Sequence, residues 1–487
     1  MQYVYRNSDY NLLIFQHERS GYHMRHLTMK KSTMRVQDMT QGSPLRLIVS
    51  FAVPLFIGNV FQQLYTVADT MVVGRGLGDS AIAAIGATSA LYNLLIDFAW
   101  GMNSGCGIVV TQCFGAHDEK KLRQSIAGMM ILDAAVTAAL TLLSLLFMGP
   151  LLHYMNTPDS IFAQARVYIA IICAGMIFTI GYNMFAAVLR AVGNSRAPLY
   201  FLIASSLLNI TLDVLAVLIF RLGVAGAALA TVAAQAVSAL LCGAYLFRNY
   251  WSILPNREDF RPVRSIYMEL VSAGFSMALM ICVVDLGSTI FQRANNLLGE
   301  TYITAHTAAR RLISIMMQPI STIANANSTF TGQNWGAKKL DRIQTALKKV
   351  ICLEVLYGLF ACATIYLFGG VLVRFTTGTT NAEVIANAVM SLRIHFSCFP
   401  VLAILLCLRT AMQAMGRKTI PVLSSGIELA MKIVSAWLLI PRMGFLGTCV
   451  TEPVTWVLMT VFLTAAYWLG QKKQLVPCEC KEAKTAV

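Results

Sequence analysis

The chain contains 487 residues, of which 57% are hydrophobic and 13% are charged, with a mean hydropathy of +0.63. Soluble domains carry about 25% charged residues, so this composition excludes a soluble globular protein. The net charge of +15 lies in short loops between apolar runs, which favours contact with a lipid bilayer and argues against nucleic acid as a partner.

Long apolar runs recur along the chain and predict an all-α integral membrane protein with twelve transmembrane helices. Each run is long enough to cross a bilayer as a helix. The segment before the first helix is polar and contains internal methionines, which suggests Met34 or Met39 as the natural start. The predicted helices cover residues 46–73, 82–113, 123–148, 162–190, 199–220, 224–247, 266–298, 303–330, 342–372, 384–414, 420–440 and 445–469.

Lys and Arg are distributed unevenly between alternate loops, and this bias predicts orientation in a membrane. One set of loops, together with the C-terminal tail, is rich in both residue types and includes the linker at 248–264. The opposite set holds Arg75, Arg221, Arg374 and Arg442. We therefore expect a multi-pass protein of the cell membrane, with both termini and the central linker in the cytoplasm.

Three glycine motifs occur twice at nearly the same separation, which indicates an internal repeat. Each half contains an even number of helices, so both halves enter the membrane from the same side. We therefore predict two six-helix lobes related by a parallel pseudo-twofold repeat. The motif pairs are Gly78 and Gly299, Gly115 and Gly336, and Gly193 and Gly416, separated by 221, 221 and 223 residues. The expected domains are a polar tail (1–45), an N-lobe (46–247), a linker (248–265), a C-lobe (266–469) and a second tail (470–487).

Polar residues occur at helical spacing in two predicted helices of the N-lobe. In the first helix Asp69 shares a face with Gln62, and in the fifth helix Asn209 and Asp213 are four residues apart. A carboxylate within the bilayer costs roughly 2.5–3.5 kcal/mol on insertion scales. Such residues therefore usually mark the path of an ion or a proton.

Two further polar residues, Asn183 and Thr231, lie in the fourth and sixth predicted helices. Carboxylate, amide and hydroxyl oxygens are the ligands that hard cations prefer, so Asp69, Asn209 and Asp213 are suited to hold a sodium ion. Two ionised acids that face one another also repel unless a cation or a proton lies between them. The same pair suits either sodium binding or proton exchange.

Four segments resemble the MATE family of multidrug and toxin extrusion transporters. Their order and spacing resemble the family from about Thr40 to Gly470. The resemblance implies efflux of amphipathic, often cationic compounds, driven by an inward flow of sodium or protons. The segments are residues 54–75 (PLFIGNVFQQLYTVADTMVVGR), the Gly115-Ala116 loop, residues 189–194 (LRAVGN) and residues 223–231 (GVAGAALAT).

The resemblance also implies a site for coupling to a cation or a proton in the N-lobe. The C-lobe departs from this pattern, because Lys432 occupies the position equivalent to Asn209. Glu428 and Lys432 are instead spaced to form an ion pair along one helix. The N-lobe residues that match the family's coupling site by type are Asp69, Asn183, Asn209, Asp213 and Thr231.

Pro54 lies within the first predicted helix, where proline removes a backbone hydrogen bond and bends the helix. The bend is either a hinge that couples ion binding at Asp69 to helix shape or a static kink. A second group of polar, aromatic and sulfur-containing side chains is expected to line a substrate cavity. These candidates are Gln62, Tyr65, Asp97, Tyr182, Met184 and Asp285.

These features predict a secondary active transporter that exports organic cations or drugs by antiport with sodium or protons. It is expected to act as a monomer in the bilayer, without a cofactor and not as an enzyme. One alternative is a lipid-linked oligosaccharide flippase of a related fold, which would need a cationic cavity for pyrophosphate. The other is a membrane-embedded enzyme, but the sequence contains no HExxH or GxSxG motif, and no P-loop for ATP.

Overall fold

The computed structural model describes residues 37–154 and 157–475, and every regular element in these ranges is helical. The segments 1–36 and 476–487, which include most of both expected tails and the suggested start at Met34, lie outside the described residues. The first half contains α1 (Pro44–Leu77), α2 (Asp79–Gly115), α3 (Glu119–Tyr154), α4 (Asp159–Ala174), α5 (Met176–Ala191), α6 (Arg196–Asp213), the π-helical η1 (Val214–Ile219) and α7 (Gly223–Asn249). Two 3-10 turns, η2 (Trp251–Ile253) and η3 (Arg257–Phe260), connect the halves. The second half contains α8 (Arg264–Asn296), α9 (Glu300–Gly336), α10 (Leu340–Thr377), α11 (Ala382–Ser397), α12 (Phe399–Ala414), α13 (Thr419–Val434), the π-helical η4 (Ser435–Leu439), α14 (Ile440–Met443) and α15 (Phe445–Leu475).

The helices provide twelve membrane-spanning units, six in each half, which confirms the predicted fold class. Among the described residues, nine helices are long and apolar enough to cross a membrane, and two bent pairs bring the total to eleven. The remaining unit is α9. It has 37 residues, which is long enough to cross a membrane, but it is less apolar than the other spans. Its polar residues Asn327, Gln333 and Asn334 are fully buried, so protein and not lipid surrounds them.

The predicted helices 162–190 and 384–414 are each broken into a bent pair, which corrects the prediction of single helices. α4 and α5 meet at Gly175 with an angle of 42°, and α11 and α12 meet at Cys398 with an angle of 52°. A Cβ on Gly175 would lie 2.4 Å from a valine side chain of α7, so only glycine fits this contact. At the second bend, Pro400 in the first turn of α12 cannot donate the hydrogen bond that would continue α11.

Backbone conformation repeats along with the sequence motifs. His117 and Lys338, in equivalent loops, adopt left-handed φ angles of 55° and 56°. A positive φ is uncommon for a residue other than glycine, so its presence in both halves shows that the two loops share one geometry. Three repeat-related glycine pairs also have positive φ, namely Gly78 and Gly299, Gly193 and Gly416, and Gly223 and Gly444.

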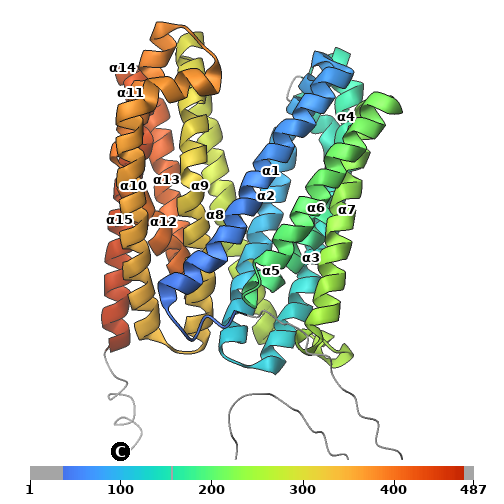
Figure 1. The fold of residues 1–487 in the computed structure, drawn as a ribbon, viewed down its shortest axis with the longest axis vertical. Coiled ribbons are helices and arrows are strands. Elements are labelled where there is room, and N and C mark those ends of the chain that lie inside the picture. The colour runs from blue at the N-terminus through green and yellow to red at the C-terminus, as the bar shows by residue number, and fades with distance from the viewer. Residues whose placement is uncertain (1–36, 155–156, 476–487) are drawn as a thin grey trace, which may run out of the picture. The chain divides into compact units, whose positions relative to one another are not determined.

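The helices group into an N-lobe, α1 to α7, and a C-lobe, α8 to α15 (Figure 1). The longest contact between the lobes runs along α2 and α8, and α2 also packs against α9. α1 lies at the boundary, because it packs against both α6 of the N-lobe and α9 of the C-lobe. These contacts place α1, α2, α8 and α9 between the lobes, where a transport pathway would run.

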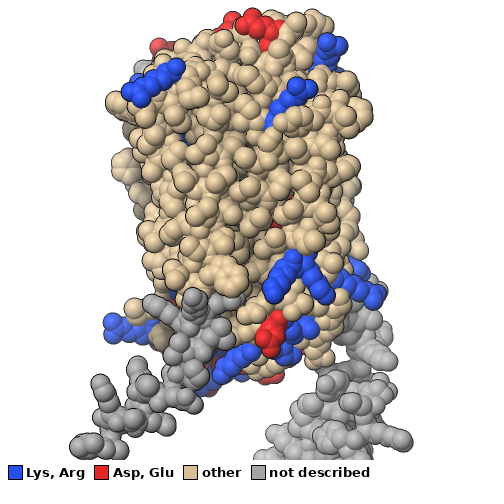
Figure 2. Space-filling model, turned by 90° about the vertical axis from the view of Figure 1, so that its left-hand side faces the viewer, with Lys and Arg blue, Asp and Glu red and all other residues tan. Residues whose placement is uncertain are grey.

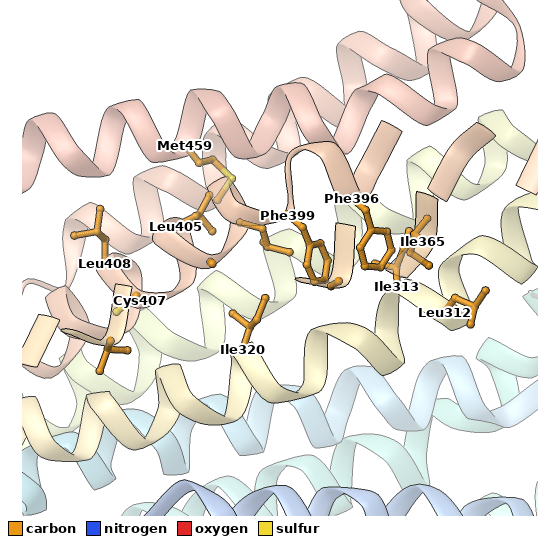
Figure 3. Packing of buried hydrophobic residues seen from close by; sticks show 14 of the residues in the cluster. Leu312, Ile313, Ile320, Ile365, Phe396, Phe399, Leu405, Cys407, Leu408 and Met459 are labelled. Atoms are coloured by element: carbon orange, nitrogen blue, oxygen red, sulfur yellow. The ribbon is translucent and has the colours of Figure 1, made fainter. Parts of the chain in front are cut away.

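A hydrophobic core fills the C-lobe between α9, α10, α12 and α15 (Figure 3). Phe396 and Phe399, on either side of the bend between α11 and α12, are fully buried. Their rings stack with centroids 4.3 Å apart. Ile313 and Ile365 belong to the same cluster, so the bend is held by apolar packing on both sides.

We expect Phe399→Ala to lower the free energy of unfolding by about 3–5 kcal/mol, the usual cost of truncating a fully buried aromatic ring. The melting temperature of the purified protein in detergent measures this loss. Phe375→Ala is the matched control, because the Phe375 side chain is 87% exposed. Equal losses in the two variants would show that the stacked pair does not hold the bend.

Charged side chains distinguish the ends of the molecule from its middle. Figure 2 shows a middle belt with almost no charged side chains and a gathering of Lys and Arg toward the lower end. This end carries the start of α1, the loops after α2, α5, α9 and α12, and the connection at 250–263. We call it the basic end. An apolar belt between charged ends is the surface expected of a protein in a bilayer.

Candidate functional site

A cavity of about 710 Å³ lies between the two lobes. α1, α2, α5, α6 and α7 form most of its wall, and α8, α9 and α12 complete it. Its described lining is mainly apolar and neutral polar, with one acid, Asp97, and one base, Arg190. The volume is in the range of sites that hold small molecules.

The structure places the six residues predicted for the substrate cavity in two groups. Met184 does not line the cavity, because α5 directs its side chain into the hydrophobic cluster of the N-lobe, where it is 6% exposed. Asp285 of α8 is not part of the lining either, but its carboxylate is close enough to that of Asp97 for the two to interact electrostatically. The other four, Gln62, Tyr65, Asp97 and Tyr182, line the cavity.

Asp69 of α1 and Asp213 of α6 face each other within interaction distance, and we call them the acid pair. Asp213 has no exposed surface, and Asn209, one turn earlier, is 4% exposed. Both carboxylate oxygens of Asp213, both amide atoms of Asn209 and Oδ1 of Asp69 have no hydrogen-bond partner among the described residues. Because buried polar atoms are normally partnered, this set of oxygens fits a bound cation or proton.

Two tyrosines border the acid pair. Tyr65 of α1 and Tyr168 of α4 are both close enough to Asp69 and Asp213 for electrostatic interaction. Tyr65 also lines the cavity, so this side chain lies beside both the cavity and the acid pair. Tyr168 was not predicted from the sequence, because spacing along α4 does not show which helices lie beside it.

The other two predicted coupling residues are placed differently. Asn183 of α5 lines the cavity wall. Thr231 of α7 donates its hydroxyl proton to the backbone carbonyl of Ala227, one turn earlier, at 3.1 Å. Of the five predicted residues, the described interactions therefore bring together the acid pair, with Asn209 adjacent to it on α6.

The C-lobe carries ion pairs where the N-lobe carries the acid pair. Lys432 Nζ lies 2.8 Å from Glu428 Oε1, which confirms the pair predicted from their spacing. Glu452 of α15 accepts a hydrogen bond from Arg310 of α9 and lies 3.5 Å from His395 Nε2. Because Glu428 and Glu452 are neutralised by cations of the same lobe, they are poorer candidates for ion coupling than the acid pair.

α1 passes from the C-lobe to the N-lobe along its length. Ile48 and Phe51, near its start, are fully buried in the hydrophobic cluster of the C-lobe. Asp69, near its other end, faces Asp213 of the N-lobe. Pro54 lies between these two regions, within the helix and in the cavity wall. A change of bend at Pro54 would therefore alter how the two lobes are joined.

Two glutamines join the lobes at the basic end. Gln112 of α2 donates a hydrogen bond to the backbone carbonyl of Ala414, at 2.7 Å. Gln333 of α9 donates one to the backbone carbonyl of Ala191, at 2.9 Å. Both donors and both acceptors are related by the repeat, so each lobe closes on the other in the same way.

Two glycines allow α2 and α9 to touch backbone to backbone beside these glutamines. A Cβ on Gly115 would lie 2.0 Å from the carbonyl oxygen of Gln333. A Cβ on Gly336 would lie 2.0 Å from the carbonyl oxygen of Gln112. No side chain fits at either position, which explains why the Gly-Ala motif is present in both lobes.

A membrane-spanning protein with two similar lobes around a central cavity has the architecture of a secondary transporter, and the fold and cavity define this chain as a transporter and not an enzyme. The MatE family model matches residues 54–215 and again residues 276–438. The chain therefore belongs to the MatE family, the multidrug and toxin extrusion transporters. The two matches also place one copy of the family repeat in each lobe.

Individual relatives agree with this assignment. The chain is 26% identical over 349 residues to the probable multidrug resistance protein YpnP of Bacillus subtilis (strain 168), a match covering 72% of this chain and 78% of YpnP. It is 22% identical over 454 residues to a FAD transporter of Shewanella oneidensis (strain MR-1), covering 91% of this chain and 96% of that protein. A crystal structure of MATE in the bent conformation shares the fold, with a TM-score of 0.84 at 22% identity, covering 91% of this chain and 99% of that one.

Proposed function

We propose that the protein exports amphipathic, cationic small molecules in antiport with sodium ions or protons. The acid pair carries this proposal. Asp69 and Asp213 lie in helices that span the membrane, with buried oxygens that have no partner among the described residues. Acidic groups kept there at a cost in insertion free energy are best explained by binding a cation or a proton during transport.

The coupling step follows from the position of the acid pair on α1 and α6. A cation or proton between Asp69 and Asp213 removes their mutual repulsion and holds α1 against α6. Because the start of α1 is packed in the C-lobe, this contact biases the angle between the lobes through Pro54. Each unit charge that enters the cell contributes about 2.3 kcal/mol per 100 mV of membrane potential.

The cavity supplies the substrate site in this proposal. Asp97 is the acid in its described lining, and its charge would attract an organic cation while the aromatic side chains Tyr65 and Tyr182 contact the apolar part of the molecule. The lining does not favour a flippase for lipid-linked oligosaccharides, because a pyrophosphate would require several basic groups and Asp97 would repel it.

The orientation and the functional unit are also inferred. The excess of Lys and Arg at the basic end supports a cytoplasmic location for this end and for both termini. The close contacts of Gly115 and Gly336 then hold the two lobes together on the cytoplasmic side. The described residues of one chain line the cavity and form the acid pair, which supports a monomer as the functional unit.

Proteoliposomes that contain the purified protein test the proposed function. We expect efflux of a cationic dye when an inward sodium gradient or an inward proton gradient is imposed, because either ion can occupy the acid pair. Dye fluorescence follows the transport, and liposomes without protein give the background. Absence of transport under both gradients would rule out ion-coupled antiport.

A further inference from the structure

Arg190, near the end of α5, lines the cavity but has no role in the proposed function. It is half-buried, and no hydrogen bond or ion pair to its side chain is present among the described residues. The groups that interact with it electrostatically, Tyr182 and Cys242, are neutral side chains at ordinary pH. A guanidinium that is partly removed from water is costly unless an anion partners it, and the described residues supply none.

The surroundings of Arg190 favour an anion. The amino end of α6 lies in the same cavity wall through Ser195 and Pro198, and the amino end of a helix carries a partial positive charge. Asn183 and Gln235 add amide groups that can donate hydrogen bonds. The acid in the described lining, Asp97, does not form an ion pair with Arg190, so the two charges remain available to a ligand.

The repeat shows that the charge is not required by the helix geometry. The residue equivalent to Arg190 in the C-lobe is Gln413, at the same distance before the repeated glycine. Gln413 also lines the cavity and donates a hydrogen bond to Met280 Sδ at 2.9 Å. A neutral amide therefore satisfies the same position of the fold, and the guanidinium is a feature of the N-lobe alone.

We infer that Arg190 is the anion subsite of the cavity, and that the preferred substrates carry a carboxylate or phosphate at Arg190 and a cationic group at Asp97. The planar guanidinium matches these anions with two parallel hydrogen bonds. This inference rests on the proposed export function and narrows its substrates from simple organic cations to compounds with charges of both signs.

Two rhodamine dyes test the subsite, one with a free carboxylate and the other its methyl ester, which shares the same cationic ring system. Binding to the purified protein in detergent without anionic lipid is measured by fluorescence anisotropy. We expect Arg190→Gln to weaken binding of the carboxylate dye by about tenfold or more, as for the loss of a charge-assisted contact, and to leave the ester unchanged. Arg190→Lys should cause a smaller loss for the carboxylate dye.

Asp97→Asn is the matched control for the other charge. It should weaken binding of both dyes, because both carry the cation. Equal losses of both dyes in Arg190→Gln, or no loss of the carboxylate dye in either Arg190 variant, would overturn the anion subsite. Binding is read without any ion gradient, so this result is independent of whether sodium or protons drive transport, and failure of the antiport experiment leaves it interpretable.

Discussion

Asp69→Asn and Asp213→Asn should each reduce gradient-driven efflux to the background of protein-free liposomes. The two carboxylates face each other, and Asp213 is fully buried with no hydrogen-bond donor to its oxygens among the described residues. An amide has nearly the same shape as a carboxylate but carries no charge, so it cannot bind a sodium ion strongly or exchange a proton. The change should therefore remove coupling without disturbing the packing of α1 against α6.

The control for this result is Asp79→Asn, which changes an exposed acid at the start of α2 and should retain full transport. Dye binding without a gradient should persist in both acid-pair variants, because the cavity lining is unchanged. The double variant should be no more defective than either single variant, since the two residues act as one unit. Full gradient-driven transport by both single variants would remove the acid pair from the mechanism.

Gly115→Ala and Gly336→Ala should shift the protein away from the state in which the basic end is closed. The added methyl group would lie 2.0 Å from a backbone oxygen of the opposite helix, so α2 and α9 must separate. Overpacking of this kind costs about 1–3 kcal/mol, which corresponds to roughly a 5- to 150-fold change in the balance of two states. Transport should fall because one half of the cycle becomes unfavourable.

Labelling of a cysteine in the cavity measures this shift. In a variant without native cysteines, Ser328→Cys places a thiol in the cavity wall on α9. A membrane-impermeant reagent on the side of the basic end should label this thiol faster after Gly115→Ala. Gly181→Ala and Gly426→Ala are the controls, because their added methyl groups meet no atom within 4 Å. An unchanged labelling rate in the two test variants would show that the basic end does not open at this contact.

The fold was largely predictable because its signals are local or repeated. Apolar runs long enough to cross a bilayer predicted all twelve spans, including α9 as residues 303–330, and the nearly equal spacing of three glycine pairs predicted the parallel repeat. The bend between α4 and α5 was not predicted, because the side chain that leaves no room for a Cβ at Gly175 belongs to α7, which is distant in the sequence. The sequence alone does not explain why α9 carries polar residues within a membrane span. The structure explains it, because these residues are buried between the lobes.

The candidate site was predictable in part. The helical spacing of Asn209 and Asp213 placed both on one buried face of α6, as the structure has them. Spacing within a helix says nothing about neighbouring helices, so Tyr168 of α4 could not be connected with the acid pair. For the same reason Met184 was assigned to the cavity although its side chain points into the N-lobe core. Arg190 lies in the LRAVGN segment (189–194), but its place in the cavity wall depends on the packing of α5, which the sequence does not show.

The course of α1 through both lobes has a consequence for biosynthesis. Ile48 and Phe51 leave the ribosome early, but the C-lobe helices that α1 packs against, α9 and α10, are made much later. Contacts between residues so distant in sequence form slowly, because a long loop must close first. The N-lobe therefore cannot complete its fold as an isolated product of the first half of translation. Until the C-lobe is inserted, the first turns of α1 need lipid or a membrane chaperone to cover them.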